Sequence, residues 1–150
     1  MEEDVKYMRQ ALAEARKAYA EDEVPVGAVL VMGGRIIARA HNLTETLNDA
    51  TSHAEMQVLT SAMAELRSKY LPDCTLYVTV EPCVMCAGAI IQSRIKNCFY
   101  GAKNDRFGVH KGPINLFEVN FNHKVNVEGG ILENECSKIL TDFFKELRNK

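Results

Sequence analysis

The chain has 150 residues, of which 47% are hydrophobic and 25% charged, and its formal net charge is −2. This length and composition are typical of one globular domain with a sizeable core. No apolar run approaches the ~20 residues that span a bilayer, and the acidic N-terminus lacks an apolar segment. These features exclude a membrane span and a signal peptide, so we expect a cytoplasmic protein.

Hydrophobic periodicity predicts a helix over about the first 20 residues. An apolar run from Val24 to Met32 is followed by Gly33-Gly34, a pair typical of a two-residue hairpin turn, and by a strand from Arg35 to His41. Residues 42–52 are polar and turn-like. The remaining expected elements are a helix over 53–69, strands over 75–80, 98–101 and 125–127, and helices over 83–93 and 132–148.

Residues 102–124 form the least regular part of the sequence. No linker, repeat or low-complexity segment divides the chain. The alternation of helices and strands therefore predicts a single α/β domain over residues 1–150, with helices on both faces of a mixed sheet.

The most informative pattern is His53-Ala54-Glu55, followed later by Pro82-Cys83-Val84-Met85-Cys86. It supplies an imidazole, two thiols and one carboxylate that is not needed as a ligand. Catalytic zinc sites use three protein ligands and leave the fourth position to water. The spacing resembles the H-x-E…P-C-x-x-C signature of zinc-dependent nucleobase deaminases.

Local sequence indicates how these residues come together. Ser52 and Glu55 fit a capping box at the start of the 53–69 helix, and Pro82 suits the first position of the next helix. Cys83 and Cys86 then share one face at a helix N-terminus, where the helix dipole favours thiolates. We therefore expect one Zn²⁺ per chain, bound by an imidazole and two thiolates.

Glu55 is the expected catalytic residue. Two thiolates neutralise Zn²⁺, so another group must help the bound water to ionise. A carboxylate beside a zinc-bound water can shuttle its proton to the ring nitrogen and the leaving amine.

Two other interpretations of the cysteines remain open. Cys83 and Cys86 also fit a thioredoxin-like redox pair, which leaves His53 and Glu55 unexplained. A structural zinc would need a fourth ligand, and His41, His110 and His123 are the candidates.

The odd number of cysteines argues against a disulfide framework, and Cys74, Cys98 and Cys136 are expected to be buried thiols.

Basic residues outnumber acidic ones between residues 94 and 124. Residues 94–124 include Arg94, Lys96, Lys103, Arg106, Lys111 and Lys124. Screening limits the reach of distant charges, so a local basic face can bind phosphates despite the acidic average. Ordinary solvated lysines would give the same pattern.

Beyond the motif, the chain resembles the bacterial tRNA adenosine deaminase family over nearly its whole length. The segments that carry the resemblance are Val24 to Val29, His53 to Glu55, Thr75 to Ile90, Asn122 to Val125 and Asp142 to Phe144. The resemblance implies a cytidine deaminase-like three-layer α/β/α sandwich with a mixed sheet of about five strands. It also implies a homodimer that converts adenosine to inosine at the wobble position of a tRNA anticodon stem-loop.

The same resemblance implies a set of substrate contacts. Asn42 would hydrogen-bond the flipped base, and Val26 and Ala54 would line its pocket. Asn122 would lie near the anticodon nucleotides, and Phe144 would contact a neighbouring base from the last helix, over about 132–148, which would contribute to RNA binding.

One position departs from the family pattern. Asn104 stands where relatives usually carry an Asp that faces the ribose of the target nucleotide, so we expect weaker discrimination between RNA and DNA. Asp105 could compensate through a small register shift, and sugar preference could also be set elsewhere.

The main functional alternative is a deaminase of a free base or nucleoside, of the guanine or cytosine type. A non-enzymatic zinc or redox module is a further alternative. Phe143 and Phe144, with Lys145 and Arg148 nearby, favour a polynucleotide substrate, because stacking combined with phosphate contacts is how single-stranded RNA is held.

Overall fold

The structure, a computed structural model, describes residues 2–150. The elements alternate in the order predicted from the sequence. They are α1 (Glu2–Ala20), β1 (Gly27–Met32), β2 (Arg35–His41), α2 (Ala54–Leu66), β3 (Cys74–Val80), α3 (Val84–Gln92), β4 (Asn97–Ala102), a 3-10 turn η1 (Leu116–Glu118), β5 (Asn126–Glu128) and α4 (Glu133–Arg148).

The strands form one mixed sheet in the order β2-β1-β3-β4-β5. β1 pairs antiparallel with β2 and β3, whereas β3, β4 and β5 run parallel. The predicted hairpin turn joins β1 and β2, and Gly33 and Gly34 adopt φ values of 58° and 76°, as the favoured two-residue hairpin turn requires.

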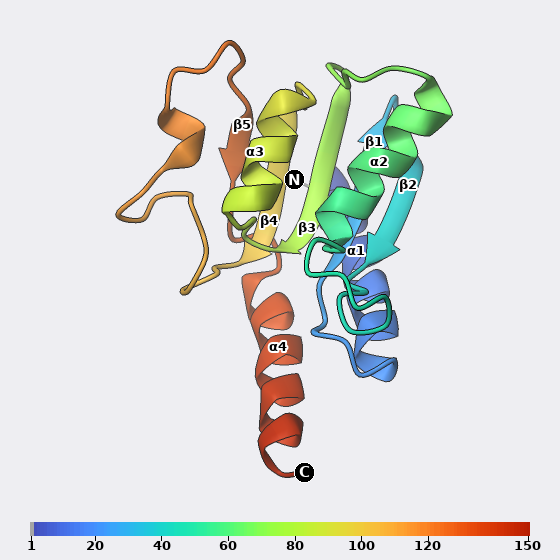
Figure 1. Cartoon of the computed structure of the whole chain (residues 1–150), viewed down its shortest axis with the longest axis vertical. Helices are drawn as coiled ribbons and strands as arrows, with labels where there is room; N and C mark the ends of the chain where they lie inside the picture. The colour runs from blue at the N-terminus through green and yellow to red at the C-terminus, as the bar shows by residue number, and fades with distance from the viewer. Residues whose placement is uncertain (1) are drawn as a thin grey trace.

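Helices cover both faces of the sheet, so the fold is the predicted α/β/α sandwich (Figure 1). α2 and α3 pack on one face through a core that includes Val58, Leu59 and Ile90. α1 packs on the other face through Met8 and Leu12, beside Cys136 of α4. The C-terminal part of α4 projects past the end of the sheet in Figure 1.

β1 approaches α1 so closely that only glycine fits at its first residue. A Cβ atom on Gly27 would collide with the backbone oxygen of Ala11 and would lie 2.5 Å from the backbone nitrogen of Ala15. Thr79 Oγ1 accepts a 3.1 Å hydrogen bond from the Gly27 N–H. The end of β1 that leads to Val26 is thereby fixed between α1 and β3.

Several boundaries differ from the predicted ones. The first strand begins at Gly27 and not at Val24, because the Val26 N–H bonds to the Val24 carbonyl in a tight turn around Pro25. α2 ends at Leu66 and not at Lys69, because Arg67 adopts the left-handed conformation with φ 51°. Among residues 2–150, no helix is both long and apolar enough to cross a membrane.

Candidate active site

The first turns of α2 and α3 bring three potential metal ligands together. His53 is the N-cap of α2, Cys83 is the N-cap of α3, and Cys86 lies in the first turn of α3. His53 Nδ1 lies 3.6 Å from Cys83 Sγ and 3.5 Å from Cys86 Sγ. One ligand atom from each residue lies within 4.8 Å of the other two, a spacing that a single ion can bridge.

Two predicted details of these helix starts are wrong. Ser52 does not cap α2, since the helix has no side-chain cap and the Ser52 hydroxyl donates to Asp49 Oδ2 at 2.9 Å. Pro82 precedes the N-cap of α3 and is not its first helical residue. In both helices the N-cap is a candidate metal ligand, and its side chain lies in the cluster and makes no hydrogen bond to the helix N–H groups.

The chemistry of the three donors suits a thiophilic, borderline metal such as zinc. Hydrogen bonds from the Cys86 thiol and the His53 imidazole lower the pKa of Cys83 to about 4, so this thiol is ionised at neutral pH. The same thiolate, together with burial, raises the pKa of Cys86. Interaction with Cys83 raises the pKa of His53. The cluster therefore already stabilises one thiolate, the form that binds metals.

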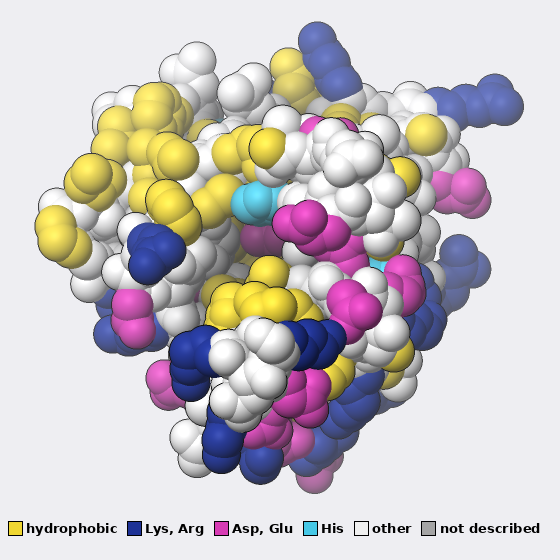
Figure 2. Space-filling model, turned by 60° about the horizontal axis from the view of Figure 1, so that its bottom comes forward, with side chains coloured by type: hydrophobic (Ala, Val, Ile, Leu, Met, Phe, Trp, Pro, Cys, Tyr) yellow, Lys and Arg dark blue, Asp and Glu magenta, His cyan; other side chains and the backbone are white. Residues whose placement is uncertain are grey.

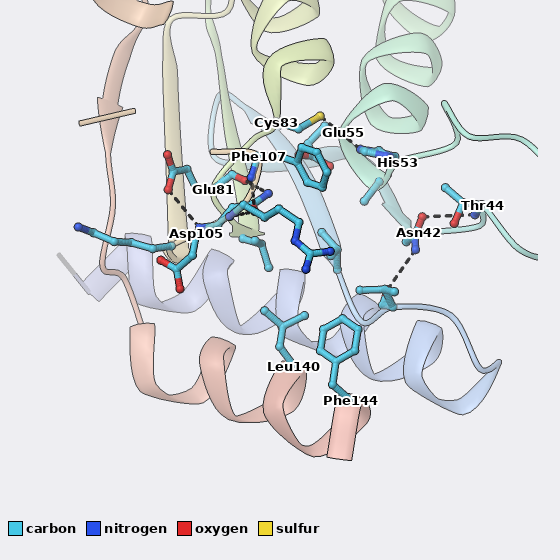
Figure 3. A pocket seen from close by; sticks show the side chains of 17 residues that line it. Asn42, Thr44, His53, Glu55, Glu81, Cys83, Asp105, Phe107, Leu140 and Phe144 are labelled. Carbon is cyan, nitrogen blue, oxygen red and sulfur yellow. Dashed lines mark hydrogen bonds between the residues drawn. The ribbon is translucent and has the colours of Figure 1, made fainter. Parts of the chain in front are cut away.

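Glu55 lies in the first turn of α2, two residues after His53, and its side chain is only 4% exposed. It lines the same cavity as His53 and Cys83 (Figure 3). Burial raises the pKa of Glu55 to about 7. The expected catalytic carboxyl group therefore borders both the candidate metal ligands and the cavity that a substrate would occupy.

The cavity next to this cluster has a volume of about 710 Å³. Pockets for drug-sized ligands occupy roughly 300–1,000 Å³, so this cavity has room for more than a single base. Five of the six predicted substrate contacts line it together with Glu55: Val26, Asn42, Ala54, Asn104 and Phe144.

The amide of Asn42 is held in a fixed orientation by the backbone. Its Nδ2 donates to the Val24 carbonyl at 3.3 Å, and its Oδ1 accepts the Thr44 N–H at 3.3 Å. A side-chain amide has two N–H groups and two acceptor lone pairs, so one of each is left for a base.

Asn104 is the second residue of a segment that we call the cavity loop, residues 103–110. Its Oδ1 accepts the N–H groups of Arg106 at 3.3 Å and Phe107 at 3.0 Å, and its Nδ2 reaches the Glu81 carbonyl at 3.5 Å. The side chain thus borders the cavity while it organises the turn. A ribose contact by Asn104 remains a prediction.

Glu81 anchors both ends of the cavity loop from the end of β3. Its carboxylate is buried and accepts the N–H of Asn104 at 3.1 Å and the N–H of His110 at 2.8 Å. A Cβ atom on Gly108 would lie 2.5 Å from this carboxylate, so the loop fits against Glu81 only with glycine at that position.

Two adjacent phenylalanines of α4 have different environments. Phe143 is 7% exposed and packs against Tyr19, with ring centroids 5.6 Å apart. Phe144 is 41% exposed and lines the cavity. Helix packing is therefore the role of Phe143, and Phe144 is available to a ligand.

Asn122 does not lie in this cavity. It borders a separate depression with Tyr70, Arg94 and Phe121. The predicted role of Asn122 near the anticodon therefore requires RNA to extend beyond the cavity described above.

The histidines proposed as a fourth ligand are engaged elsewhere. His41 contacts Glu14 and Glu21, His110 contacts the Tyr100 hydroxyl at 2.8 Å, and His123 contacts the Ile95 carbonyl at 2.7 Å. Within residues 2–150 the cluster contains His53, Cys83 and Cys86 alone. Cys74, Cys98 and Cys136 are buried free thiols, as predicted.

Other cavity residues were not identified from the sequence. They are Val24, Thr44, Val80, Glu81, Phe107 and Leu140. Three further lining residues had been named from the sequence: Asp105 as a possible sugar contact, and Lys103 and Arg106 as part of a basic stretch. Leu140 had a usable signal, since it precedes Phe144 by four residues and thus shares its helix face. No sequence signal identified Phe107, because an irregular loop has no periodicity that predicts which way a side chain points.

The fold and the site together define a deaminase domain. The family model described as MafB19-like deaminase matches residues 2–148. A tRNA-specific adenosine deaminase from Bacillus subtilis is 48% identical over 100% of this chain and 94% of its own length. One from Agrobacterium fabrum is 45% identical over 99% of this chain and 98% of its own length.

Solved structures of deaminases have the same fold as this chain. One from a study of A-to-I editing by tRNA:A34 deaminases has a TM-score of 0.86, is 45% identical and covers 90% of this chain and 99% of its own. A guanine deaminase from Nitrosomonas europaea has a TM-score of 0.83 and is 26% identical, covering 93% and 83% of the two chains. The chain belongs to the family of tRNA-specific adenosine deaminases.

Proposed function

We propose that this protein is a zinc-dependent enzyme that hydrolyses adenosine to inosine at the wobble position of a tRNA anticodon. The observation that carries the proposal is the placement of buried Glu55 beside His53, Cys83 and Cys86 at one side of a large cavity. The tRNA substrate is supported by relatives at 42–48% identity that are named for it.

His53, Cys83 and Cys86 would hold one zinc ion per chain. Bound zinc would supply a water molecule that ionises near neutral pH. Glu55 would accept a proton from the attacking water and deliver it to the ring nitrogen. It would then take the second proton from the hydroxyl group added to the ring carbon and deliver it to the amine, which leaves as ammonia. Val26 and Ala54 offer apolar surface to the purine, and Asn42 offers a donor and an acceptor to its edge.

Base extrusion makes the cavity suitable for an anticodon nucleotide. A base in a single-stranded loop costs less to unstack than one in a duplex. α4 contributes Leu140 and Phe144 to the cavity wall, and Lys145 and Arg148 follow on the same helix. We therefore assign RNA binding to α4 within one deaminase domain that spans the chain.

The alternative substrate is a free base such as guanine. The guanine deaminase from Nitrosomonas europaea has the same fold but only 26% identity, against 45% for the tRNA:A34 deaminase structure. Incubation with total tRNA and, separately, with free nucleosides and guanine distinguishes the two. We expect inosine in tRNA and no ammonia from free bases, and the reverse result would overturn the proposal.

We further infer a cytoplasmic homodimer. Large hydrophobic side chains away from the cavity are exposed on α3 and the segment that follows the cavity loop: Val84, Ile114, Val119 and Phe121. Figure 2 shows hydrophobic side chains gathered on one side of the molecule. Contiguous exposed apolar surface is typical of an interface. Sedimentation equilibrium should give twice the chain mass of 16.8 kDa.

A further inference from the structure

Phe107 is an exposed aromatic residue within the active-site cavity. Its side chain is 62% exposed, more than the 41% of Phe144, and both residues line the same cavity. Leaving a large apolar side chain in water forgoes the stabilisation that burial would give. An aromatic ring kept at a cavity mouth offers a rigid apolar face to a ligand.

The backbone around Phe107 is held by specific hydrogen bonds. The Phe107 N–H donates to Asn104 Oδ1 at 3.0 Å, and the next residue, Gly108, donates its N–H to the Asn104 carbonyl at 3.0 Å. Gly108 also forms an isolated bridge with Cys83. The turn that presents Phe107 is therefore tied directly to a metal ligand, and its position relative to the catalytic cluster is set before substrate arrives.

Another part of the chain, α4, adds two apolar side chains to the lining of this cavity. Leu140 and Phe144 lie on one face of α4 and line the same cavity as Phe107. In Figure 3 Phe107 lies at the end of the cavity near Glu55 and His53, and Phe144 lies at the end formed by α4. Both aromatic side chains thus border the cavity that the target nucleotide would enter.

Cations accompany this arrangement. Lys103 and Arg106 line the cavity, and neither forms an ion pair with any residue of the described chain. Free cations beside aromatic faces are how proteins hold single-stranded nucleic acid, with phosphates on the charges and bases on the rings. A free purine would use neither the second aromatic face nor the cations.

We propose that Phe107 is a substrate-binding residue that stacks on one neighbour of the target adenosine, while Phe144 contacts the neighbour on its other side. This inference rests on the proposed tRNA substrate. The two rings would hold the flanking bases apart and leave the target base free to enter toward Glu55. Stacking is tolerant of base identity, so Phe107 would position the strand and contribute little to sequence choice.

The first test compares three substitutions of Phe107 on an anticodon stem-loop. Phe107→Ala should lower kcat/KM and RNA affinity by about 5- to 150-fold, the range that loss of one stacked base gives. Phe107→Trp retains a stacking face and should stay near wild type, whereas Phe107→Leu retains apolar surface only and should resemble Phe107→Ala. Leu47→Ala, 55% exposed and outside the cavity lining, is the matched control.

The second test removes bases from the RNA. Stem-loops with an abasic nucleotide on either side of the target adenosine are compared for wild type and Phe107→Ala. We expect one of the two abasic substitutions to weaken wild type strongly and Phe107→Ala hardly at all. Equal losses in both proteins at both positions would overturn the role of Phe107 while the proposed function stands.

The two proposals fail in different ways. If wild type deaminates the stem-loop and Phe107→Ala binds and reacts equally well, the Phe107 proposal alone is overturned. A wild-type protein that neither binds nor deaminates the stem-loop overturns the proposed function and the stacking role with it.

Discussion

The Glu81 carboxylate and the backbone N–H of His110 are joined by a 2.8 Å hydrogen bond. Through this bond and a second one to the Asn104 N–H at 3.1 Å, one buried side chain at the end of β3 fixes both ends of the cavity loop. Glu81 precedes the Pro82-Cys83 pair directly. The metal cluster and the loop that faces it are thereby anchored at neighbouring residues.

Replacing Glu81 should loosen the cavity loop without removing the metal ligands. Glu81→Ala leaves two N–H groups without their acceptor, and a buried unsatisfied group costs about 1–3 kcal/mol. We expect urea denaturation to show a free energy of unfolding lower by about 2–6 kcal/mol for the two groups together, with zinc content unchanged. Glu81→Gln keeps one acceptor oxygen and should lose less. Wild-type stability of Glu81→Ala would show that the loop is held by other contacts.

The three ligands predict one zinc per chain. The triple variant His53→Ala, Cys83→Ala, Cys86→Ala should contain no zinc by metal analysis, because the residues that form the cluster are gone. Cys98→Ala is the control, since Cys98 is a buried free thiol of the core and its loss should leave the zinc content unchanged. Wild-type zinc content in the triple variant would place the ion elsewhere.

Glu55→Ala should slow the deamination reaction without loss of the bound zinc. Glu55 lines the cavity but contributes no atom to the metal cluster, so the variant should keep its zinc and its fold. Proton transfer by a positioned side chain contributes about 10² to 10⁴-fold, and single-turnover deamination should slow by at least this much. Ordinary turnover would remove Glu55 from the mechanism.

Substitutions of the neighbouring residues Phe143 and Phe144 should affect two different properties, the stability of the protein and its affinity for RNA. Phe144→Ala removes an exposed cavity residue and should weaken tRNA binding by about 1–3 kcal/mol in a filter-binding assay. Phe143→Ala removes a buried ring and should instead lower the free energy of unfolding, by about 3–5 kcal/mol for a fully packed site. A Phe144→Ala variant with wild-type tRNA affinity would contradict the stacking role.

The sequence predicted the structure correctly wherever a residue pattern corresponds to one fixed geometry of the chain. Periodicity predicted the order of helices and strands, and the spacing of His53, Cys83 and Cys86 predicted the cluster because each lies in the first turn or at the N-cap of a helix. The capping box was wrong because Ser52 has a competing partner, Asp49, in the preceding loop. Local motifs cannot reveal such partners.

The cavity loop was the hardest part to predict. It contains no regular element, and its shape depends on Glu81, which lies over 20 residues earlier in the chain. The roles of Phe107 and Arg106 follow from that long-range anchoring and not from their neighbours in sequence. Asn122 was placed through resemblance alone, and the structure locates it at a different depression.

Asn104 provides the last prediction, which concerns the choice between RNA and DNA. Its Oδ1 is occupied by the Arg106 and Phe107 N–H groups, and its Nδ2 presents donors where an aspartate would present a second acceptor oxygen. Asn104→Asp keeps the turn through one oxygen and replaces Nδ2, which donates to the Glu81 carbonyl at 3.5 Å, by a second acceptor oxygen. That oxygen can accept a hydrogen bond from the ribose 2′-OH, the group that distinguishes RNA from DNA.

We therefore expect the wild-type protein to accept deoxyadenosine in a single-stranded loop better than its Asn104→Asp variant does. Deamination rates on matched RNA and DNA anticodon stem-loops give the measurement, and the RNA-to-DNA rate ratio should rise in Asn104→Asp. Asp105→Asn is the control, because Asp105 also lines the cavity and could supply the sugar contact by a register shift. An unchanged ratio in Asn104→Asp, with a lower ratio in Asp105→Asn, would assign sugar discrimination to Asp105.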